Sequence, residues 1–139
     1  MSKVFIDANI LVYCLDQSNA EKMDRCRNLI REVITEGRGV ISTQVIQEFY
    51  VAATKKLGAE PLLVKDIITS LERFETVVVT PAVIKEAIDC AIIHRLSFWD
   101  SLIIAAADSA KCDILWTEDL NDGQIVRSVR IINPFVIDA

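Results

Sequence analysis

The sequence predicts an α/β fold: a three-layer α/β/α sandwich in which helices cover both faces of a mostly parallel sheet of about five strands. Two observations lead to this prediction. Short apolar runs alternate along the chain with longer segments whose apolar residues recur at helical spacing. The short runs are apolar at consecutive positions, as in strands that are buried on both faces. No internal repeat and no linker rich in proline, glycine or serine interrupts this pattern, so we expect one domain over residues 1–139.

The strands are expected where the apolar runs are short and rich in β-branched residues. The first run ends at Asp7, Ala8 and Asn9, which we interpret as a turn. Because a helix separates most consecutive strands, the crossovers favour parallel pairing. The predicted strands cover residues 4–6, 40–41, 76–79, 114–116 and 129–132.

Most of the predicted helices have a clear start or end signal. Gly37 and Gly39 follow the first helix and end it. Ser42 or Thr43 can cap the second, and prolines suited to a first helical turn open the third and fourth. The last helix is apolar on nearly every side and is therefore expected to be central and buried. The predicted helices cover residues 19–36, 43 to about 58, 61 to about 74, 81–92 and 100–110.

The composition excludes several classes of protein. With 52% hydrophobic and 25% charged residues, the chain is expected to fold rather than remain disordered. Its net charge of -5, taken as a total, has the wrong sign for non-specific binding of nucleic acid. The longest apolar run of its most hydrophobic segment, residues 102–107, is far shorter than the ~18 residues of a membrane span. We therefore expect no membrane partner, and the four scattered cysteines favour a reducing, cytoplasmic location.

Five carboxylates are expected at one edge of the sheet. Right-handed crossovers bring the carboxyl ends of parallel strands, and the helix N-termini that follow them, to the same edge. Asp7 follows the first strand directly, and Asp119 and Asp122 follow the fourth. Glu48 lies in the first turns of the helix after the second strand, on its apolar face, and Asp100 begins the buried helix. The topology therefore predicts that these five acids approach one another.

Clustered carboxylates indicate a metal site. A buried carboxylate is costly unless it is paired or bound to a metal, and several together raise one another's pKa values unless cations neutralise them. Oxygen ligands alone suit Mg²⁺ or Mn²⁺. Each acid also has a structural interpretation: Asp7 could form an Asx turn, Asp100 could belong to a capping box with Ser97, and the loop acids could be solvated. The joint arrangement, rather than any single acid, carries the metal hypothesis.

Other catalytic machinery finds less support in the sequence. A Ser–His–Asp or Cys–His apparatus would depend on the only histidine, His94, and no Gly-x-Ser-x-Gly elbow is present. No Gly-x-Gly-x-x-Gly or Gly-x-x-x-x-Gly-Lys loop for a nucleotide cofactor occurs either. A phosphatase with Asp7 as nucleophile is an alternative, although Asn9 stands where such enzymes typically need a second acid.

Four segments of the chain resemble the acidic motifs of PIN domains. They are FIDANIL at 5–11, STQVIQEF at 42–49, SFWDSLI at 97–103 and WTEDL at 116–120. Their order, their spacing and the length of the chain all match, so the resemblance extends over essentially the whole sequence. Within the family, the sequence is most similar to VapC-type toxins, which are compact ribonucleases of prokaryotic toxin–antitoxin pairs.

The resemblance implies metal-dependent cleavage of RNA phosphodiester bonds by an activated water. It implies that Asp7, Asp100 and Asp119 hold Mg²⁺ or Mn²⁺. Glu48 would hold a second ion or orient a metal-bound water. The remaining implied roles are an outer ligand and two supporting hydrogen-bonding residues, namely Asp122, Asn9 and Thr117.

The resemblance also implies partners: an RNA substrate, a cognate antitoxin protein and a second copy of the chain in a homodimer. Basic residues must hold RNA outside the acidic centre, and the candidates lie on the helix at 19–36: Lys22, Arg25, Arg27 and Arg31. A further alternative is a catalytically silent PIN module that only binds RNA or protein. The complete set of acids favours the enzyme.

Overall fold

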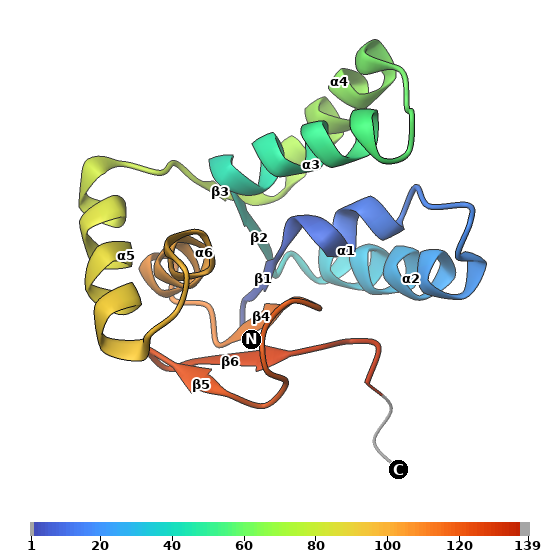
Figure 1. Ribbon diagram of the computed structural model, residues 1–139. Helices are drawn as coiled ribbons and strands as arrows, with labels where there is room; N and C mark the ends of the chain where they lie inside the picture. Colours follow the sequence, from blue (N-terminus) through green and yellow to red (C-terminus); the bar gives the residue numbers. More distant parts are fainter. Residues whose placement is uncertain (1, 137–139) are drawn as a thin grey trace.

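A six-stranded sheet in the order β3-β2-β1-β4-β6-β5 runs through the computed structural model, which describes residues 2–136 (Figure 1). Strands β3, β2, β1, β4 and β6 are parallel, and β5 pairs antiparallel with β6 at one edge. The mostly parallel α/β architecture predicted from the sequence is thus confirmed. The strands are β1 (Val4–Ile6), β2 (Gly39–Ser42), β3 (Glu75–Val77), β4 (Ile114–Trp116), β5 (Ile125–Val126) and β6 (Val129–Ile132).

Helices lie on both sides of this sheet. In Figure 1, α5 and α6 stand on the left of the central strands and α1 and α2 on the right, while α3 and α4 pack together above α1. The helices are α1 (Ala8–Tyr13), α2 (Ala20–Glu36), α3 (Thr43–Lys55), α4 (Pro61–Ser70), the 3₁₀ turn η1 (Leu71–Arg73), α5 (Pro81–His94) and α6 (Phe98–Ser109).

The ends of the helices follow the residues that the sequence singled out. Gly37 takes a left-handed φ of 66° after α2, and its N–H donates to the carbonyl of Ile34. The hydroxyl of Ser42, rather than that of Thr43, caps α3 by accepting the N–H of Val45 at 3.3 Å. Prolines occupy the first turns of α4 and α5, as predicted.

Gly39 has a packing role that the sequence did not indicate. A Cβ atom at this position would fall 2.3 Å from the ring of Phe74, so only glycine lets the ring close onto the start of β2. Gly37 alone ends the helix. The prediction that both glycines end the helix was therefore correct for Gly37 and wrong for Gly39, which is the first residue of β2.

Strand β3 covers Glu75–Val77 rather than residues 76–79, and α3 ends at Lys55 rather than near residue 58. Two further elements were not predicted at all. The residues after Asp7 form the short helix α1 instead of a turn, and the carboxylate of Asp7 is its N-cap. Strand β5 was not predicted; Arg127 and Ser128, with φ of 52° and 66°, join it to β6 through a tight turn. The positive φ values of such turns favour Asn and Gly, so an Arg-Ser pair gave no sequence signal.

The core is built around β1 and α6. All three residues of β1 are buried, and so is every residue of α6 from Ser101 to Ala107. The prediction of a central, buried last helix is confirmed. Within residues 2–136, no single helix is both long enough and apolar enough to cross a bilayer. Helices α5 and α6 have the required length and apolar character only when taken together, and the pair is bent by 118°.

Candidate active site

The carboxyl ends of β1 and β4 meet at the centre of the sheet. Ile6 is in register with Trp116, and the N–H of Asp7 donates to the Trp116 carbonyl at 3.0 Å. Asp7 and Thr117, the residues that follow the two strands, therefore stand side by side. This is the edge at which open parallel sheets carry their ligand sites.

Asp7 is a buried carboxylate with hydrogen bonds to both oxygens. It is 8% exposed. Its Oδ1 accepts the N–H of Ala8 at 2.7 Å, and its Oδ2 accepts the hydroxyl of Thr117 at 2.8 Å. Burial raises the pKa of Asp7 to about 6; the two hydrogen bonds oppose this, and the negative charges of Glu48 and Asp119 add to it.

Asn9 connects the two sides of the site. Its Nδ2 donates to Oδ2 of Asp119 at 3.0 Å and lies 3.3 Å from the hydroxyl oxygen of Thr117. The same Nδ2 is 3.5 Å from Oδ2 of Asp7, and its Oδ1 accepts the N–H of Glu118 at 3.4 Å. The structure thus places Asn9 and Thr117 between the two acids, where hydrogen bonds fix the acids relative to each other.

Glu48 and Asp100 come from the two helices that face this edge. Loss of solvation raises the pKa of Glu48, and the charges of Asp119 and Asp100 raise it further. Glu48 itself is exposed, so the expectation that it lies on a buried helix face was wrong; it faces an open cleft. Asp100 is half-buried in the first turn of α6, and its N–H donates to the Ser97 hydroxyl at 3.1 Å.

A cleft of about 520 Å³ opens over three of the five predicted acids. Asp7, Glu48 and Asp119 line it. Asp100 is not among the lining residues, but its negative charge raises the pKa of Glu48. Asp122 has a different neighbour: its exposed carboxylate accepts the N–H of Asn133 at 2.8 Å. That bond ties the loop after β4 to the segment after β6. The other residues that line the cleft include Asn9, Tyr13, Lys56 and Glu118.

The acids fit a divalent cation by their chemistry. All are hard oxygen donors of the kind that Mg²⁺ and Mn²⁺ prefer. Loss of solvation is the main cause of the raised pKa values of Asp7 and Glu48, and the charges of the neighbouring acids add to it. Among residues 2–136, however, no three His, Cys, Asp or Glu side chains are gathered closely enough to hold an ion. Of the three acids that line the cleft, Asp7 and Asp119 are held by hydrogen bonds from described residues.

Gln44 is a site residue that the sequence analysis missed. It is 5% exposed, and its Nε2 donates to the carbonyl of Trp99 at 3.2 Å, directly before Asp100. One helical turn later on α3 stands Glu48, and Gln44 lowers the pKa of that carboxyl. Gln44 therefore links the two helices that carry Glu48 and Asp100. A glutamine four residues before an acid, on a face otherwise apolar, was the available signal.

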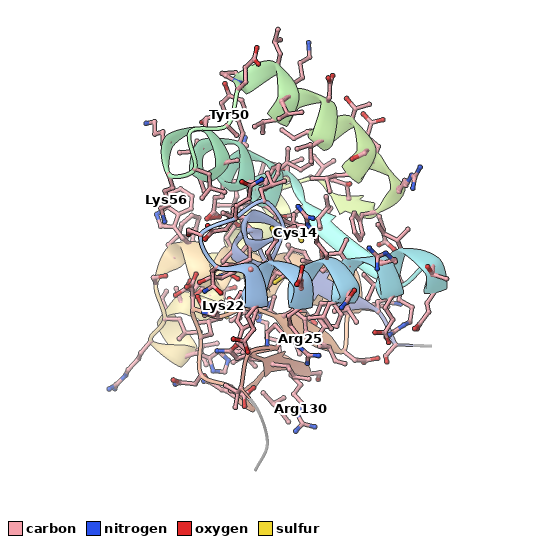
Figure 2. The ribbon with its side chains drawn as sticks, turned by 90° about the vertical axis from the view of Figure 1, so that its right-hand side faces the viewer. Cys14, Lys22, Arg25, Tyr50, Lys56 and Arg130 are labelled. Atoms are coloured by element: carbon pink, nitrogen blue, oxygen red, sulfur yellow. The ribbon has the colours of Figure 1, made fainter. Side chains whose placement is uncertain are left out.

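None of the four predicted basic residues of α2 is among the residues that line the cleft. Figure 2 shows two of them on this helix, Lys22 and Arg25. Lys22 forms an ion pair with Glu118, while Arg25 and Arg27 donate their Nε atoms to the carbonyls of Pro134 and Cys14 at 3.2 and 2.8 Å. The guanidinium of Arg31 donates to the side chain of Asn28, also on α2. The lysine that lines the cleft itself is one that follows α3, Lys56.

The model of the PIN domain family matches residues 4–124 of the sequence. This match covers both sides of the cleft, from β1 to the loop after β4. No curated protein matches the sequence at a significant level.

Solved structures with the same fold include three from bacterial toxin–antitoxin systems. A toxin–antitoxin complex from Klebsiella pneumoniae has a TM-score of 0.70 at 17% identity, over 97% of this chain and 100% of that chain. VapC20 of Mycobacterium tuberculosis, a toxin that cleaves the sarcin–ricin loop, has a TM-score of 0.70 at 15% identity, over 84% and 92%. The DNA-bound VapBC complex of Salmonella typhimurium has a TM-score of 0.67 at 19% identity, over 94% and 97%. At these identities the likeness shows a shared fold.

Proposed function

Because the chain belongs to the PIN domain family, we propose that it is a metal-dependent endoribonuclease, the toxin of a type II toxin–antitoxin pair. The observation that carries this proposal is the acidic cleft at the sheet edge. Its two sides, Asp7 and Asp119, are joined through Asn9 and Thr117. Such a cleft, repulsive to a phosphate when empty of cations, becomes attractive once divalent ions neutralise the acids.

Asp7, Glu48, Asp100 and Asp119 are the residues that would hold Mg²⁺ or Mn²⁺. When bound, such an ion lowers the pKa of a water molecule and offsets the charge that develops on the phosphate. Asp7 is fixed for this task by Thr117 and by the N–H of Ala8, which hold one orientation of its carboxylate. Glu48 is exposed to the cleft, where its carboxylate would hold an ion or orient a metal-bound water.

RNA must reach these acids along a surface with positive charge. Lys56 supports this part of the proposal, because it lines the same cleft as Asp7 and Glu48 and makes no ion pair among the described residues. Its ammonium would hold a backbone phosphate next to the one that is cut. Arg25, Arg27 and Arg31 form a second candidate surface along α2, farther from the chemistry.

An antitoxin and a second copy of the chain are the proposed protein partners. Structures of toxin–antitoxin complexes share this fold, which supports the first. The second is supported by α5, which exposes several isoleucine side chains, and clustered apolar exposure marks protein contacts. The α5 isoleucines are Ile84, Ile88, Ile92 and Ile93. The four free thiols suit the reducing cytoplasm in which we place the protein.

The phosphatase alternative fits the geometry less well. Asn9, at the position where a second acid is typical, is committed to Asp119. We therefore assign Asp7 to cation binding and not to covalent catalysis.

The direct test is incubation of the protein with total RNA, with Mn²⁺ or Mg²⁺ and with a chelator. We expect cleavage that needs the metal and that is absent in the double variant Asp7→Asn, Asp119→Asn. The opposing outcome is that the wild-type protein binds RNA and leaves it uncut in all of these conditions, with either metal as well as with the chelator. In that case the protein is a silent binding module and the proposal is wrong.

A further inference from the structure

A cluster of one acid, one lysine and two aromatic rings borders the cleft. The carboxylate of Glu118 accepts the hydroxyl of Tyr13 at 2.7 Å on Oε1 and pairs with the ammonium of Lys22 on Oε2. Glu118 stands between Thr117 and Asp119 in the sequence, so this cluster holds the loop from which both site residues project.

Lys22 is confined on several sides. Its ammonium lies 4.7 Å from the centre of the Tyr13 ring and 4.6 Å from that of Phe135, and it also donates to the Tyr13 hydroxyl at 3.3 Å. The two rings meet edge to face with centroids 5.1 Å apart. Cations over aromatic faces gain from the ring quadrupole, and more so when part of their hydration is lost. The Lys22 side chain is 30% exposed and that of Glu118 is 29% exposed, so water only partly screens the pair.

The cluster joins four parts of the fold. Tyr13 ends α1, Lys22 lies in the first turn of α2 (Figure 2), Glu118 follows β4 and Phe135 follows β6. The loop that contains Glu118 has no regular secondary structure. Its links to the site are the N–H of Glu118, which donates to Asn9 at 3.4 Å, and the N–H of Asp119, which donates to the Thr117 hydroxyl at 3.1 Å.

Asp119 depends on this loop for its place. It is exposed, and the hydrogen bond that its carboxylate makes with the described residues comes from Asn9. The Asn9 amide and the backbone of residues 117–119 together set where the Asp119 carboxylate points. Thr117 is held at one end of this segment by its N–H bond to the Ile132 carbonyl and by its hydroxyl. The Glu118 side chain anchors the next residue through an ion pair and a hydrogen bond of 2.7 Å.

We propose that Lys22 is a positioning residue: by anchoring Glu118, it fixes the loop that presents Thr117 and Asp119 to the cation-binding side of the cleft. This inference rests on the proposed function for its consequence in catalysis. It also gives Lys22 a different role from the RNA contact expected from its charge, because the ammonium is already engaged by Glu118, Tyr13 and Phe135.

The test compares Lys22→Met with Lys22→Arg, which keeps the charge, and with Lys65→Met, a control at an exposed lysine on α4. In the metal-free protein, hydrogen exchange of the Glu118 and Asp119 amides reports on the loop without using activity. We expect Lys22→Met to speed this exchange by about tenfold or more, with the α6 core unchanged. Lys22→Arg should restore most of the protection, and Lys65→Met should match the wild type.

A second measurement links the loop to the site. Calorimetric titration with Mn²⁺ should show weaker binding for Lys22→Met than for Lys22→Arg or Lys65→Met. Unchanged amide exchange in Lys22→Met would overturn the proposal, and so would faster exchange with an unchanged Mn²⁺ affinity. A variant whose only defect is a raised KM for RNA would overturn it as well. If Lys22→Met does not fold, two other variants are measured in the same way. Glu118→Gln removes the charge of the ion pair, and Tyr13→Phe removes the hydrogen bond to Glu118.

The two proposals can fail separately. Amide exchange requires neither metal nor RNA, so a wild-type protein that does not cut RNA would end the proposed function while the exchange data still decide the role of Lys22. Conversely, an active enzyme with unchanged exchange in Lys22→Met would retain the function and remove the positioning role.

Discussion

The hydroxyl of Thr117 donates a hydrogen bond of 2.8 Å to Oδ2 of Asp7, a residue 110 positions earlier in the chain. The hydroxyl oxygen of Thr117 also accepts the backbone N–H of Asp119 at 3.1 Å. A hydroxyl has one proton to donate and two lone pairs that can accept. The Nδ2 of Asn9, 3.3 Å from the Thr117 hydroxyl oxygen, uses the second lone pair, so this buried hydroxyl has no free donor or acceptor. Thr117 thereby sets the position of one acid directly and of another through its backbone.

Removal of this hydroxyl should cost stability. Thr117→Val keeps the shape of the side chain but leaves Oδ2 of Asp7 and the N–H of Asp119 without this partner. We expect the free energy of unfolding, measured with urea, to fall by about 1–3 kcal/mol. Thr69→Val, at an exposed hydroxyl on α4, is the matched control and should change it by less than about 0.5 kcal/mol. Equal losses in the two variants would contradict the role given to Thr117.

Asp7 should make stability depend on pH in an identifiable direction. Its pKa is raised from 3.8 to about 6, so the folded protein keeps a proton that the unfolded chain has already released. The protonated carboxyl therefore contributes to the free energy of unfolding in full below about pH 4, and this contribution is lost as the pH rises to about 6. In metal-free protein at pH 7, Asp7→Asn should therefore raise the free energy of unfolding, by roughly 1–3 kcal/mol. The gain should disappear near pH 4, and a loss of stability at pH 7 would show that burial does not penalise this charge.

Divalent cations should stabilise the folded protein through the same group of carboxylates. Millimolar Mn²⁺ or Mg²⁺ is expected to raise the melting temperature at pH 7.5, because binding to the folded state alone shifts the unfolding equilibrium. The shift should shrink at pH 5, where a proton competes for Asp7. Asp119→Asn should remove most of it, whereas Asp66→Asn, an exposed acid on α4, should keep it. A melting temperature insensitive to both ions would count against the metal site.

Cleavage should require three acids individually. Asp7→Asn, Asp100→Asn and Asp119→Asn are each expected to lower metal-dependent RNA cleavage by about 100-fold or more while the fold is kept, as judged by circular dichroism. Wild-type rates in any two of the three variants would remove the site assignment. A covalent aspartyl-phosphate at Asp7, detected by mass spectrometry, would instead identify the phosphatase.

The charge of Lys56 should appear in the salt dependence of RNA binding. For a single strand, the slope of log affinity against log salt becomes shallower by about 0.7 for each phosphate that the protein no longer neutralises. We expect such a change for Lys56→Met, with a raised KM, and none for Lys65→Met on the exposed face of α4. A slope equal to that of the wild type would place the RNA elsewhere, with the arginines of α2 as the next candidates.

Local signals in the sequence predicted much of the fold. Ser42, Gly37 and the two helix-opening prolines act over one turn of chain, and each helix boundary that they mark is where the structure has it. The apolar runs located β1, β4 and β6 without error. Local signals did not predict α1, because its capping residue, Asp7, directly follows a strand and was interpreted as the start of a turn.

The site was predictable in its edge but not in its contacts. Topology alone brings Asp7, Glu48 and Asp119 to one cleft. Side-chain partners over long distances in sequence cannot be read from spacing: Lys22 was assigned to RNA by its charge, and its partner Glu118 lies 96 positions away. The same holds for Gln44 and Trp99, 55 positions apart, and for Asp122, whose bond to Asn133 depends on how β5 and β6 fold back.

The central place of β1 in the sheet has a consequence during synthesis of the protein. This strand leads directly into Asp7, but one of its two neighbours in the sheet, β4, lies more than a hundred residues later in the sequence. A nascent chain that lacks β4 and Thr117 has only one side of the cleft, so the proposed enzyme could not cut RNA at that stage of its synthesis.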